Sequence, residues 1–223
     1  MNRMSSPALF ETRYDRSACE IGIVHLGFGA FHRAHQALYV DDYMDQTGDL
    51  RWGIAAVNLR AAESPSFAPL KEAQHGYVLK SMSGSGEIDF RRVRSHVKFS
   101  DWADNAEEAE ELLARSSVHM VTITVTESGY YMDETGVLNP EDPTIVAELG
   151  GGAACTIYAY LTRALARRKA AGLGGISILC CDNIRRNGKM LQRNLFAYLN
   201  LIGAEDLVEW VRAWVTFPCS MVD

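Results

Sequence analysis

The segment GIVHLGFGAFHRAHQALYVDDYM, residues 22–44, decides the fold of this chain. An apolar run leads into Gly27 and Gly29, which are separated by one residue, and an amphipathic pattern follows them. This order is typical of a strand that turns into a helix at a nucleotide-binding loop. The third glycine of the usual G-x-G-x-x-G pattern is absent, because His32 stands in its place.

The two glycines have two interpretations. Gly27 can make a tight turn, and Gly29 lets backbone N–H groups approach a pyrophosphate at a helix N-terminus. Arg33 would then add positive charge on the phosphate side. A glycine turn that only packs a helix against a strand gives the same pattern, so the two residues alone do not decide the function.

The residues around this turn predict a βαβ unit. Residues 21–26 form a short β-branched run, which predicts a buried strand. Residues 34–44 carry apolar side chains at helical spacing, and Gly48 marks the expected end of that helix. Residues 52–59, WGIAAVNL, predict a second strand. A strand, a glycine turn, a helix and a strand within about 40 residues make such a unit.

The pattern changes after the second strand. YVLKSM (77–82) and IDFRRVRSHVKF (88–99) flank a Ser-Gly-Ser-Gly turn, which predicts an antiparallel hairpin. Residues 104–116 predict a helix, with Ser100 or Asp101 as its cap. The remaining expected elements are a central strand at 118–126, a loop at 127–152, a helix at 155–171, a strand at 176–182, helices at 188–201 and 205–214, and a short final strand after Trp214.

Strands alternate with helices through most of the chain, and the strands are apolar throughout. This favours a mostly parallel sheet with helices on both faces. We therefore predict one α/β domain over residues 1–223, a doubly wound Rossmann-like fold with a small antiparallel excursion. In such sheets ligands bind beyond the carboxyl ends of the strands, so the segments that end the strands hold the candidate site residues.

Composition restricts the class of protein. The 223 residues carry a net charge of −6 and no long basic block, which argues against a nucleic-acid partner. Five cysteines without a C-x-x-C pair indicate neither a disulfide framework nor a zinc site, and they fit a reducing compartment. No apolar run reaches the roughly 18 residues that span a bilayer, and the N-terminus does not have the pattern of a signal peptide. We expect a cytoplasmic protein that acts without a membrane.

The end of the second strand carries polar residues that suit an adenosine ribose. Asn58 comes first and Glu63 follows a few residues later. A carboxylate here would accept hydrogen bonds from the ribose and disfavour a 2′-phosphate, whereas Arg60 argues mildly for the phosphate. From spacing alone, Glu63 is equally well a solvated loop acid.

Other strand ends offer further candidates. Glu127 directly follows the longest strand and suits a proton relay, although a surface acid is the simpler interpretation. Asp182 and Asn183 end the apolar run at 176–182, where Asn183 can hold a carbonyl or form an Asx turn. The chemistry of Asp223, the last residue, indicates no role.

The histidines give little support for a metal. His32 and His35 lie three residues apart, and His25 falls within the predicted strand, but no third ligand is evident. A Ser/His/Asp hydrolase has even less support, because the sequence contains no G-x-S-x-G motif. We therefore expect no metal site.

Five segments in order resemble the N-terminal domain of the polyol-specific long-chain dehydrogenases/reductases, the family of mannitol 2-dehydrogenase, fructuronate reductase (D-mannonate oxidoreductase), tagaturonate reductase and arabinitol dehydrogenase. The segments are IVHLGFGAFHRAHQALY, WGIAAVNLR, TITVTESGY, CCDNIRRNG and VTFPCSMVD. They span residues 23–223, nearly the whole chain, which makes the resemblance specific.

The resemblance implies an NAD-linked, metal-free oxidoreductase that interconverts a secondary alcohol and a ketone of a sugar alcohol or sugar acid, with NADP the less favoured cofactor. It implies catalytic roles for Glu127, in a proton channel, and for Asn183, near the reacting oxygen. The implied cofactor residues are the turn Gly27, Phe28, Gly29, Ala30, Phe31, His32 and Arg33, together with Asn58, Glu63, Thr126 and Asp223.

The family's catalytic lysine lies in a K-x-x-x-x-N-x-x-H motif of a helical C-terminal domain, and this sequence has no such motif. We therefore expect negligible dehydrogenase activity from these residues alone. The chain is then the cofactor domain of a longer enzyme, a domain completed by a separate chain, or a freestanding dinucleotide-binding or regulatory module. The substrate stays open, although VNL and VTFPC favour the fructuronate reductase branch.

Overall fold

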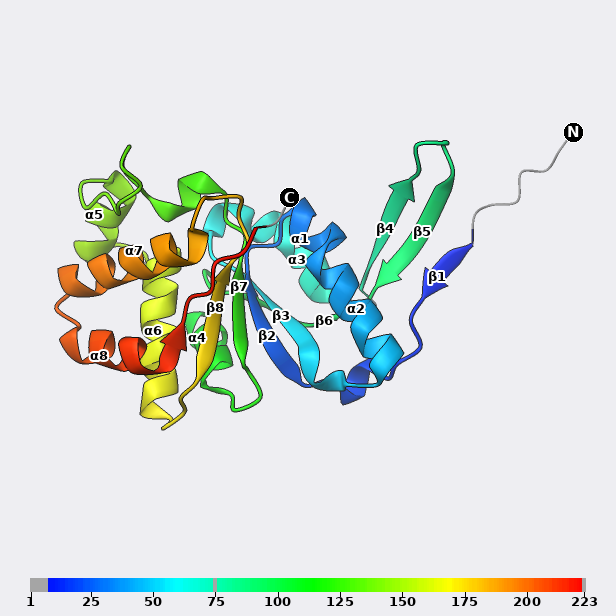
Figure 1. The fold of residues 1–223 in the computed structure, drawn as a ribbon, viewed down its shortest axis with the longest axis horizontal. Helices are drawn as coiled ribbons and strands as arrows, with labels where there is room; N and C mark the ends of the chain where they lie inside the picture. Colours follow the sequence, from blue (N-terminus) through cyan, green and yellow to red (C-terminus); the bar gives the residue numbers. More distant parts are fainter. Residues whose placement is uncertain (1–7, 74–75, 222–223) are drawn as a thin grey trace, which may run out of the picture.

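The computed structural model describes residues 8–73 and 76–221. Within these residues, six parallel strands form the central sheet in the order β6-β3-β2-β7-β8-β9 (Figure 1). Counted along the chain, this is the 3-2-1-4-5-6 order of doubly wound dinucleotide-binding folds, and the predicted fold class is confirmed. The strands are β2 (Ile21–Leu26), β3 (Gly53–Asn58), β6 (His96–Asp101), β7 (Met120–Ile123), β8 (Ile176–Cys180) and β9 (Val215–Thr216).

Helices cover the sheet from both sides. They are α1 (Ala30–Ala34), α2 (Gln36–Thr47), α3 (Ser64–Glu72), α4 (Ala106–Glu111), α5 (Pro143–Leu149), α6 (Ile157–Ala170), α7 (Asn187–Leu201) and α8 (Glu205–Trp214). Alternate residues of a strand point to opposite faces. In β2, Ile23 packs with Ala37 of α2, whereas Val24 and Leu26 join the main core with α6 and α7. The expected two-sided burial of the strands is therefore present in β2.

A second, smaller sheet has the order β1-β5-β4 and extends away from the main one (Figure 1). Its strands are β1 (Leu9–Glu11), β4 (Tyr77–Met82) and β5 (Ile88–Val93), and β4 and β5 form the expected antiparallel hairpin. The prediction of one run over 88–99 was wrong, because the chain leaves the hairpin after Val93 and enters the main sheet as β6. The alternation of a single run could not show this change of sheet.

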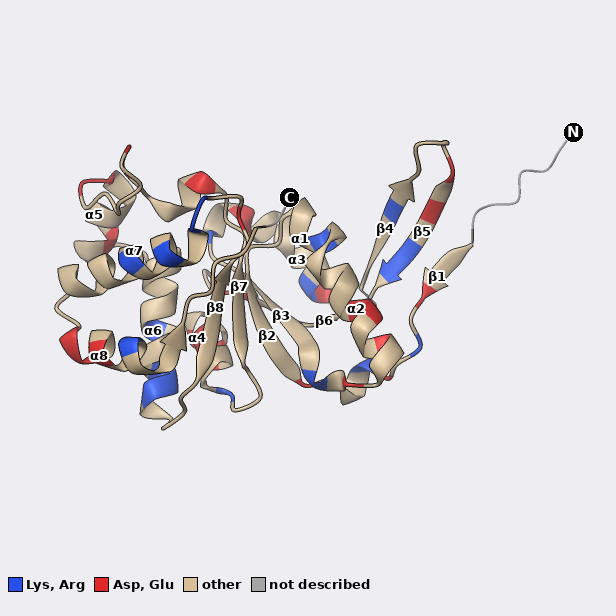
Figure 2. Ribbon diagram, viewed as in Figure 1, with Lys and Arg blue, Asp and Glu red and all other residues tan. Residues whose placement is uncertain are grey.

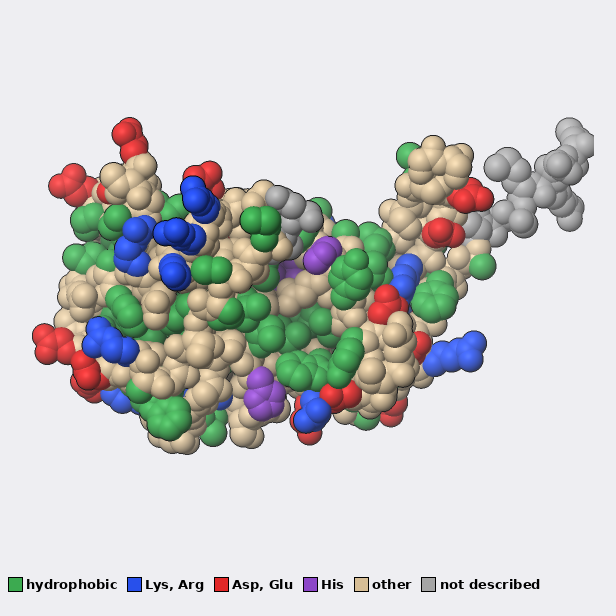
Figure 3. Space-filling view, in the orientation of Figure 1, with side chains coloured by type: hydrophobic (Ala, Val, Ile, Leu, Met, Phe, Trp, Pro, Cys, Tyr) green, Lys and Arg blue, Asp and Glu red, His purple; other side chains and the backbone are tan. Residues whose placement is uncertain are grey.

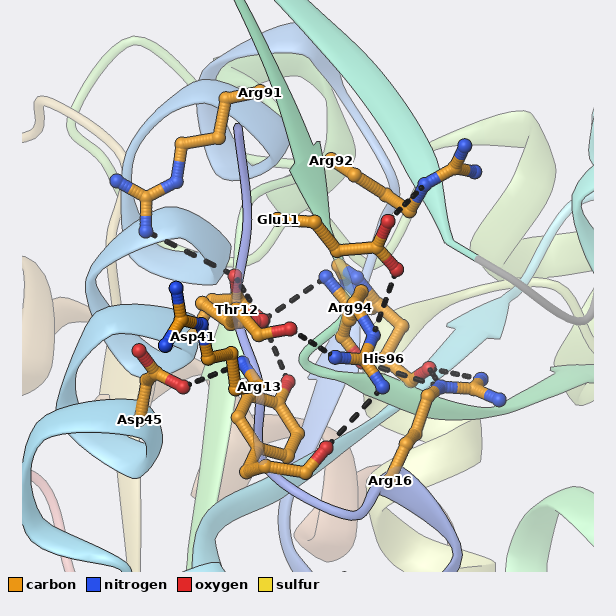
Figure 4. A network of polar contacts seen from close by, with 11 residues as sticks. Glu11, Thr12, Arg13, Arg16, Asp41, Asp45, Arg91, Arg92, Arg94 and His96 are labelled. Carbon is orange, nitrogen blue, oxygen red and sulfur yellow. Dashed lines mark hydrogen bonds and ion pairs between the residues drawn. The ribbon is translucent and has the colours of Figure 1, made fainter. Parts of the chain in front are cut away.

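A buried carboxylate ties the small sheet to the main body (Figure 4). Asp41 of α2 is fully buried and accepts hydrogen bonds from the Tyr14 hydroxyl at 2.5 Å and the Arg94 N–H at 3.0 Å. The Thr12 hydroxyl also donates to it, at 3.3 Å. Burial raises the pKa of Asp41, which these donors oppose. The N-terminal segment, α2 and the link between β5 and β6 are thus joined at one side chain.

Several predicted boundaries need correction. The helix expected at 34–44 begins earlier and is divided at His35 into α1 and α2, while its end at Gly48 is confirmed by a left-handed φ of 70°. The cap of α4 is Asn105, whose side chain accepts the Glu108 N–H at 3.1 Å. Ser100 and Asp101, the predicted caps, belong to β6.

The loop expected at 127–152 also contains regular structure. It holds a 3-10 helix, η5 (Glu127–Tyr130), and the helix α5. Asp142 caps α5 by accepting the Thr144 N–H at 2.8 Å, and a proline follows it as the first helical residue. Asp142 and Pro143 indicate the start of this helix in the sequence, whereas the three consecutive glycines after α5 favour a loop.

The last turn of α6 carries three basic residues, Arg167, Arg168 and Lys169, which contribute to packing. Arg167 contacts Glu110 at 3.0 Å, and Lys169 contacts Asp206 at 2.9 Å. Arg168 is 3% exposed and donates to the carbonyls of Leu113 at 2.9 Å and Gly174 at 2.7 Å. These contacts join α6 to the segments on either side of it.

Replacing Arg168 with methionine should lower the free energy of unfolding by about 2–4 kcal/mol, because buried carbonyls lose a charged donor. Urea unfolding of the variant and the unmodified chain measures this difference. Arg212→Met is the control, since Arg212 is exposed and its ion pair with Glu209 spans 3.4 Å. That change should cost less than about 1 kcal/mol. Equal losses in the two variants would contradict the assignment.

Candidate functional site

The glycine turn lies where the strand order reverses. Gly27 follows β2 with φ +95°, a backbone conformation that favours glycine. A Cβ atom there would lie 2.3 Å from the Thr124 carbonyl oxygen, so β2 and the end of β7 approach closely. The predicted tight turn is confirmed. Gly29 differs, because a Cβ atom there would meet no atom within 4 Å, and its surface faces open space.

A cleft of about 490 Å³ opens between this turn, the end of β3 and the end of β7. Open α/β sheets bind ligands at this position, outside the carboxyl ends of the strands at the switch point. The predicted cofactor residues that line it are Gly27, Phe28, Gly29, Arg33, Asn58, Glu63 and Thr126. Residues that we did not predict also line it, among them Ser66, Phe67, Leu70 and Tyr131.

The other predicted cofactor residues lie elsewhere. Ala30 is exposed as the first residue of α1, outside the lining of the cleft. Phe31, which is 46% exposed, and His32, which is fully buried, line a separate hollow. Asp223 lies outside the described residues. A role of His32 toward a cofactor would therefore be indirect.

Asn58 organises the loop that carries the predicted ribose acid. It is 3% exposed, and its amide nitrogen donates to the Arg60 carbonyl at 3.0 Å and to Asp101 at 3.1 Å. Arg60 and Glu63 form a loose ion pair at 3.9 Å, and both line the cleft. Asn58 thus supports the loop, while Glu63 is the carboxylate that a ligand would meet.

The end of β7 stores backbone strain at the cleft. Thr126 has φ 64° and ψ 166°, a conformation that costs a residue other than glycine about 1–3 kcal/mol. Asp182 stabilises it by accepting the N–H groups of Val125 at 3.0 Å and Thr126 at 3.2 Å. The Tyr130 hydroxyl donates to the same carboxylate at 2.6 Å. Asp182 therefore shapes the cleft, a function that its place after a buried strand could have signalled.

The two predicted catalytic residues follow neighbouring strands. Glu127 begins η5 after β7, and Asn183 lies just beyond β8, and both are exposed. Because the carboxyl ends of parallel strands lie at the same end of the sheet, Glu127 and Asn183 both lie at that end. Glu127 also lines an open hollow with Arg185, Arg186 and Lys189, and Figure 2 shows basic residues at the start of α7. This basic group would lower the electrostatic cost of negative charge near Glu127.

Three buried histidines lie behind the glycine turn. His25 and His32 stack with ring centroids 3.3 Å apart, and the Nε2 atoms of His32 and His96 lie 2.8 Å apart. His25 also contacts the Thr122 hydroxyl at 2.7 Å and the Thr124 hydroxyl at 3.0 Å. Burial lowers the pKa of His32 to about 4 and holds those of His25 and His96 well below the ordinary value. The three rings are therefore neutral near pH 7.

The part of the chain that the structure describes contains no group of three or more histidine, cysteine, aspartate or glutamate residues placed to hold a metal ion. In that same part, no helix has both the length and the apolar character needed to cross a membrane.

An apolar hollow lies between α2 and the uncovered face of β7 and β8. Figure 3 shows hydrophobic side chains and a histidine in the middle of this face. Phe31 at its rim is 46% exposed, Tyr39 is 62% exposed and Met221 is 87% exposed. Such a concentration of exposed apolar groups is typical of an interaction surface.

The chain belongs to the mannitol dehydrogenase Rossmann domain family, whose model matches residues 21–223. The mannitol 2-dehydrogenase of Pyrenophora tritici-repentis is 37% identical over 212 residues, which cover 94% of this chain and 37% of that protein. The D-arabinitol 4-dehydrogenase of Klebsiella pneumoniae is 34% identical over 200 residues, which cover 90% of this chain and 44% of that protein. The chain thus spans about two fifths of these relatives.

Solved structures show the same fold. A D-sorbitol dehydrogenase in substrate-free form has a TM-score of 0.86 and 29% identity, with 96% of this chain and 45% of that one covered. The Pseudomonas fluorescens mannitol 2-dehydrogenase, solved as a ternary complex with NAD and D-mannitol, has a TM-score of 0.86 and 30% identity. Its match covers 95% of this chain and 43% of the other. The predicted resemblance to the polyol dehydrogenases is confirmed.

The histidine cluster makes stability depend on pH. The folded pKa of His32, about 4, lies below its ordinary value, so the unfolded chain binds more protons between these values. The free energy of unfolding should therefore fall as the pH decreases from about 6.5 to 4, by up to about 1.4 kcal/mol per pH unit for each such histidine. Chemical unfolding at several pH values measures this slope.

His96→Phe should flatten the slope, because one buried histidine no longer titrates. His119→Gln is the control and should leave it unchanged, since His119 is exposed. Parallel curves for the two variants would show that the buried cluster does not cause the pH dependence.

Proposed function

We propose that the chain is the cofactor-binding domain of an NAD-dependent oxidoreductase that interconverts a secondary alcohol and a ketone of a sugar alcohol or sugar acid. The observation that carries this proposal is the cleft at the switch point, where the Gly27 turn and Glu63 face one space. Family membership supports it, as does the 30% identity to a mannitol 2-dehydrogenase solved with NAD and D-mannitol.

The residues of the cleft fit a dinucleotide. Gly29 leaves room for a pyrophosphate beside the backbone, and Arg33 supplies positive charge on the same wall. Glu63 would accept hydrogen bonds from the adenosine ribose and repel a 2′-phosphate, which favours NAD over NADP. The turn residues and Asn58 would position these groups, and the resemblance also assigns Asp223 to the cofactor residues. NAD, when bound, accepts hydride from the alcohol carbon at its nicotinamide C4.

Glu127 and Asn183 would act at the reacting end. They follow the carboxyl ends of the neighbouring parallel strands β7 and β8. We assign Asn183 to the reacting oxygen, as an amide donor, and Glu127 to proton transfer between that oxygen and solvent. Oxidation of the alcohol releases one hydride to the cofactor and one proton, so a proton acceptor is required.

The general acid/base itself would come from further polypeptide, in cis or from a separate chain. The sequence lacks the K-x-x-x-x-N-x-x-H motif of the family that it resembles, and the chain spans about two fifths of the length of its relatives. The apolar hollow over β7 and β8 would receive such a domain. We propose a cytoplasmic site of action, without nucleic-acid or membrane partners. The missing motif also favours an alternative, a freestanding dinucleotide-binding or regulatory module.

Isothermal titration should show that the chain binds NADH more tightly than NADPH. Replacing Glu63 with serine should improve NADPH binding relative to NADH by about tenfold, because a carboxylate no longer repels the 2′-phosphate and Arg60 is released to contact it. Glu72→Ser, the same change of charge at an exposed position outside the cleft lining, is the control. An unchanged NADPH to NADH ratio in Glu63→Ser would contradict the ribose role.

The chain alone should form no NADH from mannitol, D-arabinitol or D-mannonate above the uncatalysed rate, because proton transfer contributes about 10²- to 10⁴-fold and substrate orientation is lost as well. A version extended in frame through any downstream lysine motif should turn over at least one of these substrates. Absorbance at the NADH band measures both. Turnover by residues 1–223 would overturn the assignment of the acid/base to another domain, and an inactive extended enzyme that binds NADH would favour the regulatory alternative.

A further inference from the structure

α1, the helix that follows the glycine turn, is too short to be stable without contacts from other elements. α1 has five residues and ends at His35, whose φ is −121° and whose ψ is −89°. Gly29, at its N-cap, has no side chain to cap it. Isolated helices of this length are unstable in water, because too few hydrogen bonds offset the cost of ordering the chain. Contacts from outside must therefore set the direction of α1.

Tyr77 supplies one such contact from the hairpin. Its hydroxyl donates to the Arg33 carbonyl at 2.6 Å. That carbonyl lies in the last turn of α1, where carbonyls lack a backbone partner within the helix. The Tyr77 ring also meets the Phe28 ring edge-on, with centroids 5.9 Å apart. Burial raises the pKa of Tyr77, so the hydroxyl keeps the proton that it donates.

His96 supplies the second contact from β6. Its Nε2 atom lies 2.8 Å from Nε2 of His32, and its ring meets Phe28 edge-on at 4.9 Å. The register of β3 and β6 shifts between Ile54 and Ala55, which lets His96 and Phe99 stack at 5.4 Å on one face of the sheet. The Arg16 side chain donates to the His96 carbonyl at 3.1 Å, as Figure 4 shows.

With Oε1 of Gln36 facing His32, the hydrogen bonds of His32 and His96 have one proton arrangement. Nδ1 of His32 lies 3.0 Å from Oε1 of Gln36, an acceptor, so Nδ1 carries the proton and Nε2 of His32 accepts. His96 then donates through Nε2, and its Nδ1 is a bare nitrogen. That nitrogen is buried and has no hydrogen-bond partner among the described residues. The contact between α1 and β6 is thus a directional hydrogen bond between neutral rings.

We propose that Tyr77 and His96 are positioning residues for dinucleotide binding, which hold the turn 27–33 so that Gly29 and Arg33 face the cleft. They contact Phe28 before the helix and His32 and Arg33 within it. The small sheet would then help to position the turn, because it carries Tyr77 and leads into His96. The proposal rests on the dinucleotide function proposed above, and it concerns the pyrophosphate end of the ligand rather than the adenosine end.

Tyr77→Phe tests this inference in the chain of residues 1–223, because the variant keeps the ring against Phe28 and removes only the hydroxyl. Binding of NADH and of ADP-ribose, measured by isothermal titration, should weaken by about three- to tenfold, the equivalent of one lost hydrogen bond. Binding of adenosine, followed by NMR titration, should change by less than about twofold, since adenosine lacks the pyrophosphate. General destabilisation would weaken all three ligands alike.

Tyr160→Phe is the matched control. The Tyr160 hydroxyl donates to the Ala109 carbonyl at 2.9 Å in the main core, so the variant loses a similar bond far from the turn. It should bind all three ligands as the unmodified chain does. His96→Phe, which removes the nitrogen and keeps an aromatic ring, should reproduce the selective loss of Tyr77→Phe.

The outcomes separate the two proposals. If the unmodified chain binds NADH and ADP-ribose and Tyr77→Phe binds them equally well, the positioning role is overturned and the dinucleotide function stands. An equal loss of adenosine binding in Tyr77→Phe also overturns it. If the unmodified chain binds neither NADH nor ADP-ribose at millimolar concentration, the dinucleotide function fails and the positioning role fails with it.

Discussion

The close approach of Gly27 to the Thr124 carbonyl is the constraint on which the rest of the site depends. At 2.3 Å from that oxygen there is no room for a Cβ atom, and φ is +95°. The approach brings the end of β2 against the end of β7 just where the connections begin to run in opposite directions across the sheet. The cleft exists because the chain leaves the two strands toward different sides, and the turn at Gly27 directs α1 along one wall of it.

Two walls of the cleft are each held in shape by one polar side chain. Asn58 fixes the loop of Arg60 and Glu63, and Asp182 fixes the strained backbone at Thr126. Such anchors stabilise geometry because buried polar groups have few alternative partners. The histidine cluster acts in the same way, since its rings are buried and hydrogen-bonded behind the glycine turn, and burial keeps the pKa of His96 well below its ordinary value.

The two halves of the sheet differ in how they are covered. The half that holds β2, β3 and β6 carries α1, α2 and α3 on the face where the histidines lie. On that same face, Met120 of β7, Leu179 of β8 and Cys181, which follows β8, line an open hollow. Right-handed crossovers produce this asymmetry. When successive strands are added in the opposite direction across the sheet, the connecting helices lie on the other face. The surface left open is suited to more polypeptide.

The sequence by itself determined the order of strands and helices, the tight turn at Gly27 and the family. These depend on local features: apolar runs, a glycine at positive φ, and strand-end motifs that keep their order. The tertiary structure alone decided that β6 leaves the hairpin for the main sheet, that His32 faces His25 and His96, and that Tyr77 meets Arg33. The Tyr77–Arg33 contact joins residues 44 positions apart, and the His96–His32 contact joins residues 64 positions apart. Local periodicity carries no information about such pairs, because they form only when strand order and register have brought the two segments together.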